Sequence, residues 1–175
     1  MGSSAMVETN IGERLIALHT DGRIGGKAVL SFLAALSLYC AEAQVNEDML
    51  QWFSRLETVA KGSIRGITRS LIQSFYGGYW DYGEDEYEWF LHRTRDTTVT
   101  EDAFKETIRQ VQEKWVDVED ILGGTNRLVQ LLTEAEPEST WWYAPGITEA
   151  DLRALAQTLE LAAARKAQRV RLRFI

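Results

Sequence analysis

Hydrophobic residues recur along most of this chain at spacings of three and four, the period of helices with one apolar face. Ile64, Ile67, Leu71 and Phe75 form one such stripe. The stretch 27–44 is apolar on nearly every side, which is typical of a central helix wrapped by others. The pattern predicts six or seven helices, over roughly 10–20, 27–44, 46–61, 63–75, 100–115, 117–132 and 148–162.

Residues that cap helices stand at several of the predicted starts, because their side chains can accept hydrogen bonds from the first backbone N–H groups. The expected caps are Asn10 with Glu13, Asn46, Ser63, Thr100, Asp117, and Thr148 with Asp151. Two glycine pairs interrupt the pattern. Gly77-Gly78 is expected to stop the fourth helix, and Gly123-Gly124 to bend or divide the sixth.

Apolar and basic residues alternate at the C-terminus with the two-residue period of a strand. One face holds Val170, Leu172 and Phe174, and the other holds Arg169, Arg171 and Arg173. A strand needs a partner. The candidates are Ser139–Tyr143, whose Trp141-Trp142-Tyr143 run has strand propensity, and part of Asp85–Thr94.

Length and composition fit one globular domain, since the chain has 175 residues, 45% of them hydrophobic and 26% charged. Residues 1–6, MGSSAM, resemble the remnant of an expression tag and are left outside the fold. Residues 7–175 are predicted to form a single mainly helical domain, with 77–98 as the place of any subdivision. The predicted fold class is mostly α, a single-domain helical bundle with a small C-terminal β element.

Charge and cysteine content limit the cellular compartment and the classes of partner that we expect. A formal net charge of −7 argues against general affinity for nucleic acid or anionic membranes. A single cysteine, Cys40, excludes an intramolecular disulfide and, with no visible secretion signal, favours a reducing compartment. The longest apolar run, 28–43, falls short of the roughly twenty residues that span a bilayer. We therefore expect a cytoplasmic protein without a membrane partner.

The segment Tyr76–Phe90, YGGYWDYGEDEYEWF, is the most unusual part of the chain and is called the acidic aromatic segment below. Seven of its fifteen residues are aromatic, five are carboxylates and none is basic. Large rings supply contact area, and carboxylates attract cationic partners. The predicted partner-binding residues are Tyr79, Trp80, Asp81, Tyr82, Glu84, Asp85, Glu86, Glu88 and Trp89.

Structural uses of the same segment are an equal alternative. Tyr87, Phe90 and Leu91 can form a helical core face, and the acids can pair with the arginines of the final strand. Secondary candidates for partner contacts are Trp142, if its strand face is exposed, and Arg169, Arg171 and Arg173, which could hold phosphates.

No catalytic, cofactor or metal signature is found in the sequence. The stretch Gly22–Ala28 fails as a phosphate-binding loop, because the first glycine is replaced by Asp21 and the magnesium-binding hydroxyl by Ala28. His19 and His92 have no companion at ligand spacing, and Cys40 lies in an apolar helix where a thiol is inert. We expect no metal, no cofactor and no enzymatic activity.

These observations favour a non-enzymatic protein-interaction domain that binds a basic partner through the acidic aromatic segment. A small, acidic, helical, aromatic-rich profile is shared by many bacterial immunity and adaptor proteins, an analogy of composition only. Two alternatives remain. One is a small hydrolase or ligand-binding domain that uses the same carboxylates, and the other is a nucleic-acid adaptor that uses the C-terminal arginines.

Overall fold

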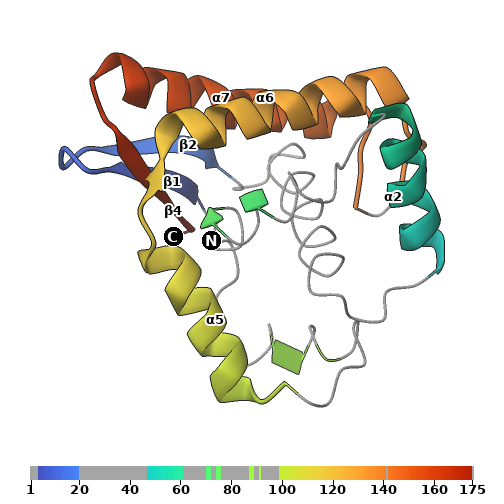
Figure 1. The fold of residues 1–175 in the computed structure, drawn as a ribbon, viewed down its shortest axis with the longest axis horizontal. Helices are drawn as coiled ribbons and strands as arrows, with labels where there is room; N and C mark the ends of the chain where they lie inside the picture. The colour runs from blue at the N-terminus through green and yellow to red at the C-terminus, as the bar shows by residue number, and fades with distance from the viewer. Residues whose placement is uncertain are drawn as a thin grey trace.

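The computed structural model describes residues 4–19, 47–60, 70–71, 74–75, 87–88, 91, 99–140 and 142–174. Within these residues the chain forms four helices and one four-stranded antiparallel sheet (Figure 1). The strands are β1 (Ser4–Thr9), β2 (Arg14–His19), β3 (Val116–Asp117) and β4 (Arg169–Phe174). The helices are α2 (Glu47–Ala60), α5 (Glu101–Glu113), α6 (Val118–Ala135) and α7 (Ile147–Ala164).

The prediction of a six- or seven-helix bundle is therefore wrong. The described fold is an α+β arrangement with the sheet order β2-β1-β4-β3. The strand at the C-terminus is confirmed, and its described neighbours are β1 and β3. The described residues of Ser139–Tyr143 form no strand, and most of Asp85–Thr94 lies outside the described residues. Because β1 pairs with β4 along its whole length, the two ends of the chain lie next to each other (Figure 1).

A hairpin replaces the first predicted helix. Backbone hydrogen bonds join Thr9 N–H to Glu13 C=O at 2.9 Å and Gly12 N–H to Thr9 C=O at 3.2 Å. Gly12 has a φ of 85°, the left-handed conformation that a three-residue hairpin loop requires and that glycine adopts most easily. Ile11, expected on the apolar helix face, is 47% exposed at this turn. Short apolar runs fit either period, and here the pairing of β2 with β1 selects the strand.

Residues 4–6, which the sequence pattern left outside the fold, are part of β1 in the interior of the sheet. Val7 lies opposite Leu172, and Thr9 lies opposite Val170. All four of these side chains are buried. They make the face of the sheet that joins the hydrophobic core, and the opposite face carries Glu8.

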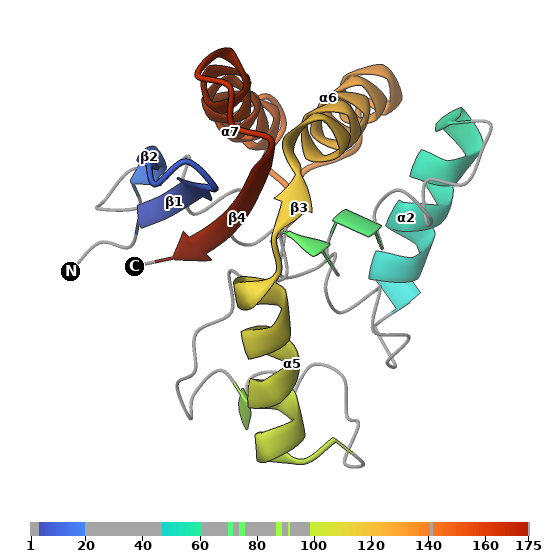
Figure 2. The same cartoon turned by 60° about the vertical axis from the view of Figure 1, so that its left-hand side comes forward.

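Helices α6 and α7 pack side by side on one side of the sheet. α5 extends away from the sheet on the other side (Figure 2). α7 contacts β1 and β2, and α2 packs against α6. The apolar face of α7 is buried, because Leu152, Leu155, Leu159 and Ala162 have no exposed surface. In α2, Trp52, Phe53 and Leu56 are buried, whereas Val59 is 41% exposed.

The predicted caps of α5 and α6 are confirmed. Thr100 Oγ1 accepts a hydrogen bond from Ala103 N–H at 3.2 Å, and Asp117 Oδ1 accepts one from Glu119 N–H at 2.9 Å. The division of the helix expected at Gly123-Gly124 is wrong, because α6 continues through both residues. Glycine weakens a helix only by about 1 kcal/mol, which burial of the apolar face of α6 can offset.

The segment between α6 and α7 also differs from expectation. Trp142 and Tyr143 lie in this connection and not in a strand, and both are buried. The turn expected at Pro145-Gly146 is present, with Gly146 at a φ of 78°. α7 begins at Ile147, so Thr148 lies inside its first turn and its buried hydroxyl accepts from Ala144 N–H at 3.0 Å.

The predicted helix 27–44 lies outside the described residues. Of the stripe predicted for the fourth helix, Leu71 and Phe75 are described, and both are buried in the core.

Candidate functional site

The acidic aromatic segment is described at two positions, Tyr87 and Glu88. The other predicted partner-binding residues lie outside the described part of the chain: Tyr79, Trp80, Asp81, Tyr82, Glu84, Asp85, Glu86 and Trp89. Of the two described residues, Tyr87 has a structural role, and the carboxylate of Glu88 faces solvent.

Tyr87 is anchored to the start of α5. Its hydroxyl donates a hydrogen bond to Val99 C=O at 2.6 Å, and its ring lies 5.6 Å from the ring of Phe104. Phe104 is buried, and Tyr87 is half-buried against the core. Glu88, the next residue, is exposed. The end of the segment is therefore held by an aromatic contact while an acid faces solvent.

A second group of charges occupies the face of the sheet opposite the core. Glu8 lies between two arginines on neighbouring strands, with Arg14 opposite it on β2 and Arg171 opposite it on β4. Arg171 Nε donates to Glu8 Oε2 at 2.5 Å, and Arg14 Nε lies 3.9 Å from Glu8 Oε1. Glu8 is 6% exposed, so it needs such partners, since a buried carboxylate is costly without hydrogen bonds.

Arg171 is also covered by an aromatic ring. Its guanidinium carbon lies 4.5 Å from the centre of the Trp115 ring, a cation–π contact. Trp115, expected on the apolar face of α5, stands just beyond that helix and is 36% exposed. The described contacts of Arg171 therefore hold it against Glu8 and Trp115.

The remaining secondary candidates have different positions. Arg169 is exposed and lies opposite Asp117 in the pairing of β3 with β4, and Arg173 lies opposite Met6 in β1. Trp142 is 3% exposed and packs edge-on against Trp52, with the ring centres 6.0 Å apart. Trp142 is thus part of the core rather than an exposed contact.

A buried polar pair lies beside these aromatic rings. The hydroxyl of Tyr143 donates a short hydrogen bond to Glu149 Oε1, and both side chains are buried. Burial, assisted by this hydrogen bond and by the nearby carboxylate, raises the pKa of Tyr143. Glu149 lies in the first turn of α7, where a carboxylate interacts favourably with the helix dipole. Its Oε2 accepts no hydrogen bond from the described residues.

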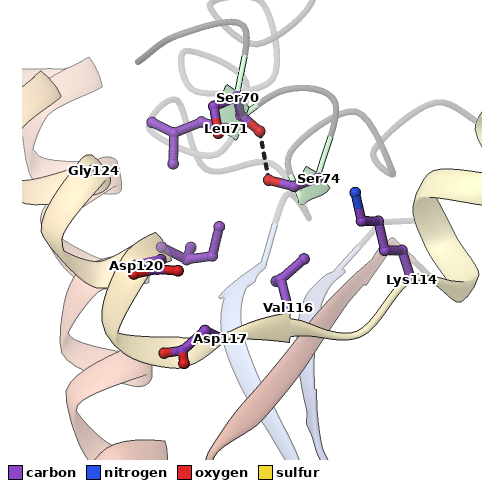
Figure 3. A pocket seen from close by; sticks show the side chains of 9 residues that line it. Ser70, Leu71, Ser74, Lys114, Val116, Asp117, Asp120 and Gly124 are labelled. Carbon is purple, nitrogen blue, oxygen red and sulfur yellow. Dashed lines mark hydrogen bonds between the residues drawn. The ribbon is translucent and has the colours of Figure 1, made fainter. Parts of the chain in front are cut away.

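A pocket of about 500 Å³ opens at the start of α6 (Figure 3). Leu71 and Ile121 are buried in its wall, and Val116 of β3 is half-buried there. Charged and hydroxyl side chains also line it, namely Lys114, Asp117, Asp120, Ser70 and Ser74. The volume lies within the range of small-ligand sites, which is roughly 300–1,000 Å³.

Lys114 lies on one side of Val116, and Asp117 and Asp120 lie on the other (Figure 3). Asp117 has a structural task as well, because its Oδ1 caps α6. Asp120, in the first turn of the helix, is exposed. The pocket therefore joins an apolar wall to separated charges of opposite sign.

On α5, by contrast, exposed charges form ion pairs along the helix. Arg109 contacts both Glu106 and Glu113, and Lys105 Nζ lies 3.1 Å from Glu101 Oε1. The hydrogen bond from Arg109 lowers the pKa of Glu106. Exposed pairs of this kind contribute little to stability and leave less charge for a partner.

Within the described ranges, no three His, Cys, Asp or Glu side chains are grouped as metal ligands. No helix in the described part of the chain is both long and apolar enough to cross a membrane.

Several residues of these sites were missed from the sequence. Glu8 and Arg14 were not recognised because Glu8 was assigned to no secondary-structure element and Arg14 was assigned to a helix. The turn-forming residues Asn10 and Gly12, placed between the short segments 4–9 and 14–19, were the available signal for a hairpin. No sequence signal brings Leu71 near Asp120, since a contact of that kind depends on packing between distant segments.

Comparison of the chain with protein-family models, with curated proteins and with solved structures returned no match. The residues and geometry described above are therefore the basis of any functional assignment.

Proposed function

We propose that the protein is a non-enzymatic interaction domain that binds a basic protein partner, with the acidic aromatic segment as its main contact. The observation that carries the proposal is the division of roles at Tyr87 and Glu88. Tyr87 is tied to α5 by its hydroxyl and its ring, and Glu88 faces solvent. A segment anchored at Tyr87, with Glu88 exposed beside it, can meet a partner at a small cost in ordering entropy.

The charge on the sheet bears on two of the alternatives. One structural use of the segment requires its acids to pair with the arginines of β4, and Arg171 is already engaged by Glu8 and Trp115. A guanidinium engaged in this way is also a poorer ligand for phosphate, so the nucleic-acid alternative loses support at this position.

Electrostatic attraction between opposite surfaces acts chiefly on the rate of association, and salt screens it. This gives a test that is independent of the partner's name. Affinity capture followed by mass spectrometry identifies the partner, and stopped-flow mixing with the purified partner measures the association rate at low and high salt. The test variant changes Asp81, Glu84, Asp85 and Glu88 to the corresponding amides.

The matched control changes four exposed acids near the end of α6 and on α7, Glu134, Glu136, Glu138 and Glu160, to glutamine. Both variants lose four negative charges, so they differ only in where those charges stood. We expect the segment variant to associate about tenfold more slowly at low salt, with a weaker salt dependence, and the control to lose much less. Equal losses in the two variants, or no loss in either, would contradict the proposal.

A further inference from the structure

The pocket at the start of α6 has the composition expected of a site for a long basic side chain. Its wall includes the buried Leu71 and Ile121 and the half-buried Val116, and Asp117 and Asp120 stand together beside it (Figure 3). We propose that this pocket receives a lysine or arginine side chain of the partner protein. This inference rests on the proposed function and specifies how the partner is anchored.

The match is one of shape and chemistry. Lysine and arginine have an apolar stem of three or four carbons that packs on apolar surface while the charged head stays among polar groups. The wall of the pocket can hold such a stem, and the carboxylates of Asp117 and Asp120 can hold the head. Basic residues that fill pockets in this way are frequent among the side chains that dominate binding energy at interfaces.

Four charged groups determine whether the pocket attracts a cationic or an anionic ligand. Asp117 and Asp120 line the pocket on one side of Val116, and Glu119 stands beside them in the first turn of α6 but outside the lining. Lys114 lines the other side of Val116. Asp117 Oδ1 already accepts from Glu119 N–H, which leaves Asp120 as the lining carboxylate that does not cap the helix. A cationic head is therefore attracted to Asp120 and repelled by Lys114.

The wall of the pocket depends on close packing between two distant segments. A Cβ atom at Gly124 would lie 2.7 Å from Leu71 Cδ2, so the missing side chain at Gly124 lets Leu71 approach α6. Leu71 closes one side of the pocket, and the preceding Ser70 accepts a hydrogen bond at its C=O from the hydroxyl of Ser74. The pocket is thus formed by tertiary contact rather than by the helix alone.

The pocket and the anchored end of the acidic aromatic segment flank opposite ends of α5. Tyr87 contacts Val99 and Phe104 near the start of the helix, and Lys114 follows its last residue. Thirteen helical residues separate the two ends by about 20 Å. A single protein interface of ordinary size, about 800 Å² on each partner, can cover both.

The test uses the whole chain with N-acetyl-arginine methylamide and N-acetyl-lysine methylamide as probes. These molecules present a basic side chain without a charged backbone. N-acetyl-norleucine methylamide has a similar stem and no charge, and so measures the contribution of the head. Binding is followed by NMR chemical-shift titration, with dissociation constants near 1 mM expected for a single side chain.

Two variants that are expected to change the binding affinity in opposite directions make the result specific. Asp120→Asn should weaken binding of the basic probes about fivefold, and Lys114→Gln should strengthen it by a similar factor. Glu119→Gln is the matched control, because it removes the same charge from the same helical turn outside the pocket lining. It should change binding much less than Asp120→Asn.

Three outcomes would overturn the inference: no shifts at the pocket residues, equal binding of the norleucine probe, or equal effects of Asp120→Asn and Glu119→Gln. A loss of binding in Lys114→Gln would also overturn it, by indicating a ligand with an anionic group. Failure here is distinguishable from failure of the proposed function. If Asp120→Asn leaves association with the captured partner unchanged while the segment variant slows it, the partner-binding role stands and the pocket has no part in it.

Discussion

Two adjacent glycines of α6 provide a sensitive test of how the chain packs. Gly123 is exposed and has open space where a Cβ would stand, whereas a Cβ at Gly124 would lie 2.7, 3.2 and 3.3 Å from three side-chain carbons of the buried Leu71. Both positions lie within the same helix. Replacing each in turn with alanine separates helix propensity from packing.

Alanine is favoured over glycine in a helix interior by about 1 kcal/mol. We expect Gly123→Ala to gain about that amount in the free energy of unfolding. Gly124→Ala gains the same propensity but forces Leu71 to move, and overpacking of a core typically costs about 1–3 kcal/mol. The net change for Gly124→Ala therefore falls between zero and about 2 kcal/mol of destabilisation.

Urea unfolding followed by circular dichroism measures both variants, and thermal unfolding checks them. For a domain of this size, 1 kcal/mol corresponds to a shift of about 2–4 °C in Tm. Leu71→Ala completes a double-mutant cycle that isolates the contact between Leu71 and position 124. In the Leu71→Ala background, Gly124→Ala should stabilise the protein as much as Gly123→Ala does. Equal stabilisation by the two alanines with Leu71 in place would refute the packing of Leu71 on α6, and with it the wall of the pocket.

Two further predictions concern α7. Lys166 has a φ of 67°, with its N–H bonded to Ala163 C=O and the next N–H bonded to Ala162 C=O, an arrangement in which glycine is preferred. Lys166→Gly should raise Tm by a few degrees, for a gain of about 0.5–1 kcal/mol, and Lys166→Ala should not. Tyr143→Phe should cost about 1–3 kcal/mol at pH 7, because Glu149 then loses its donor. Since the pKa of Tyr143 is raised in the folded state, its contribution is complete below the ordinary tyrosine pKa of 10.0 and declines as pH rises above it. Urea unfolding between pH 8 and pH 11 should show a steeper alkaline loss of stability in the wild type than in Tyr143→Phe, and parallel curves would contradict the raised pKa.

Much of the local structure could be predicted from the sequence. The periodicity placed α2, α5, α6 and α7 close to their observed bounds, and Thr100 and Asp117 cap the helices they were expected to cap. The alternation of β4 also placed Val170 and Leu172 in the core. These features depend on neighbours within one or two turns, so a short stretch of sequence contains the information that decides them.

The candidate site was predicted less well than the helices. The sequence identified the acidic aromatic segment by composition, and at its described end it left Tyr87 open to both a structural and a binding use. The contact with Phe104 assigns Tyr87 to the scaffold, while Glu88 keeps the exposure that a partner requires. Trp142 was proposed as a partner contact, but the structure places it in the core. Its local sequence could not show that Trp52, from a distant helix, packs against it.

By itself, then, the sequence determined where α2, α5, α6 and α7 form and where acids and rings concentrate. The tertiary structure decided that Ser4–Thr9 becomes a strand, that Glu8 lies between Arg14 and Arg171, and that Leu71 closes a pocket beside Asp120. The physical reason is the distance along the sequence between the residues that interact. A helix satisfies its backbone hydrogen bonds internally, whereas a strand, a buried ion pair and a pocket exist only when segments far apart in the chain are brought into contact.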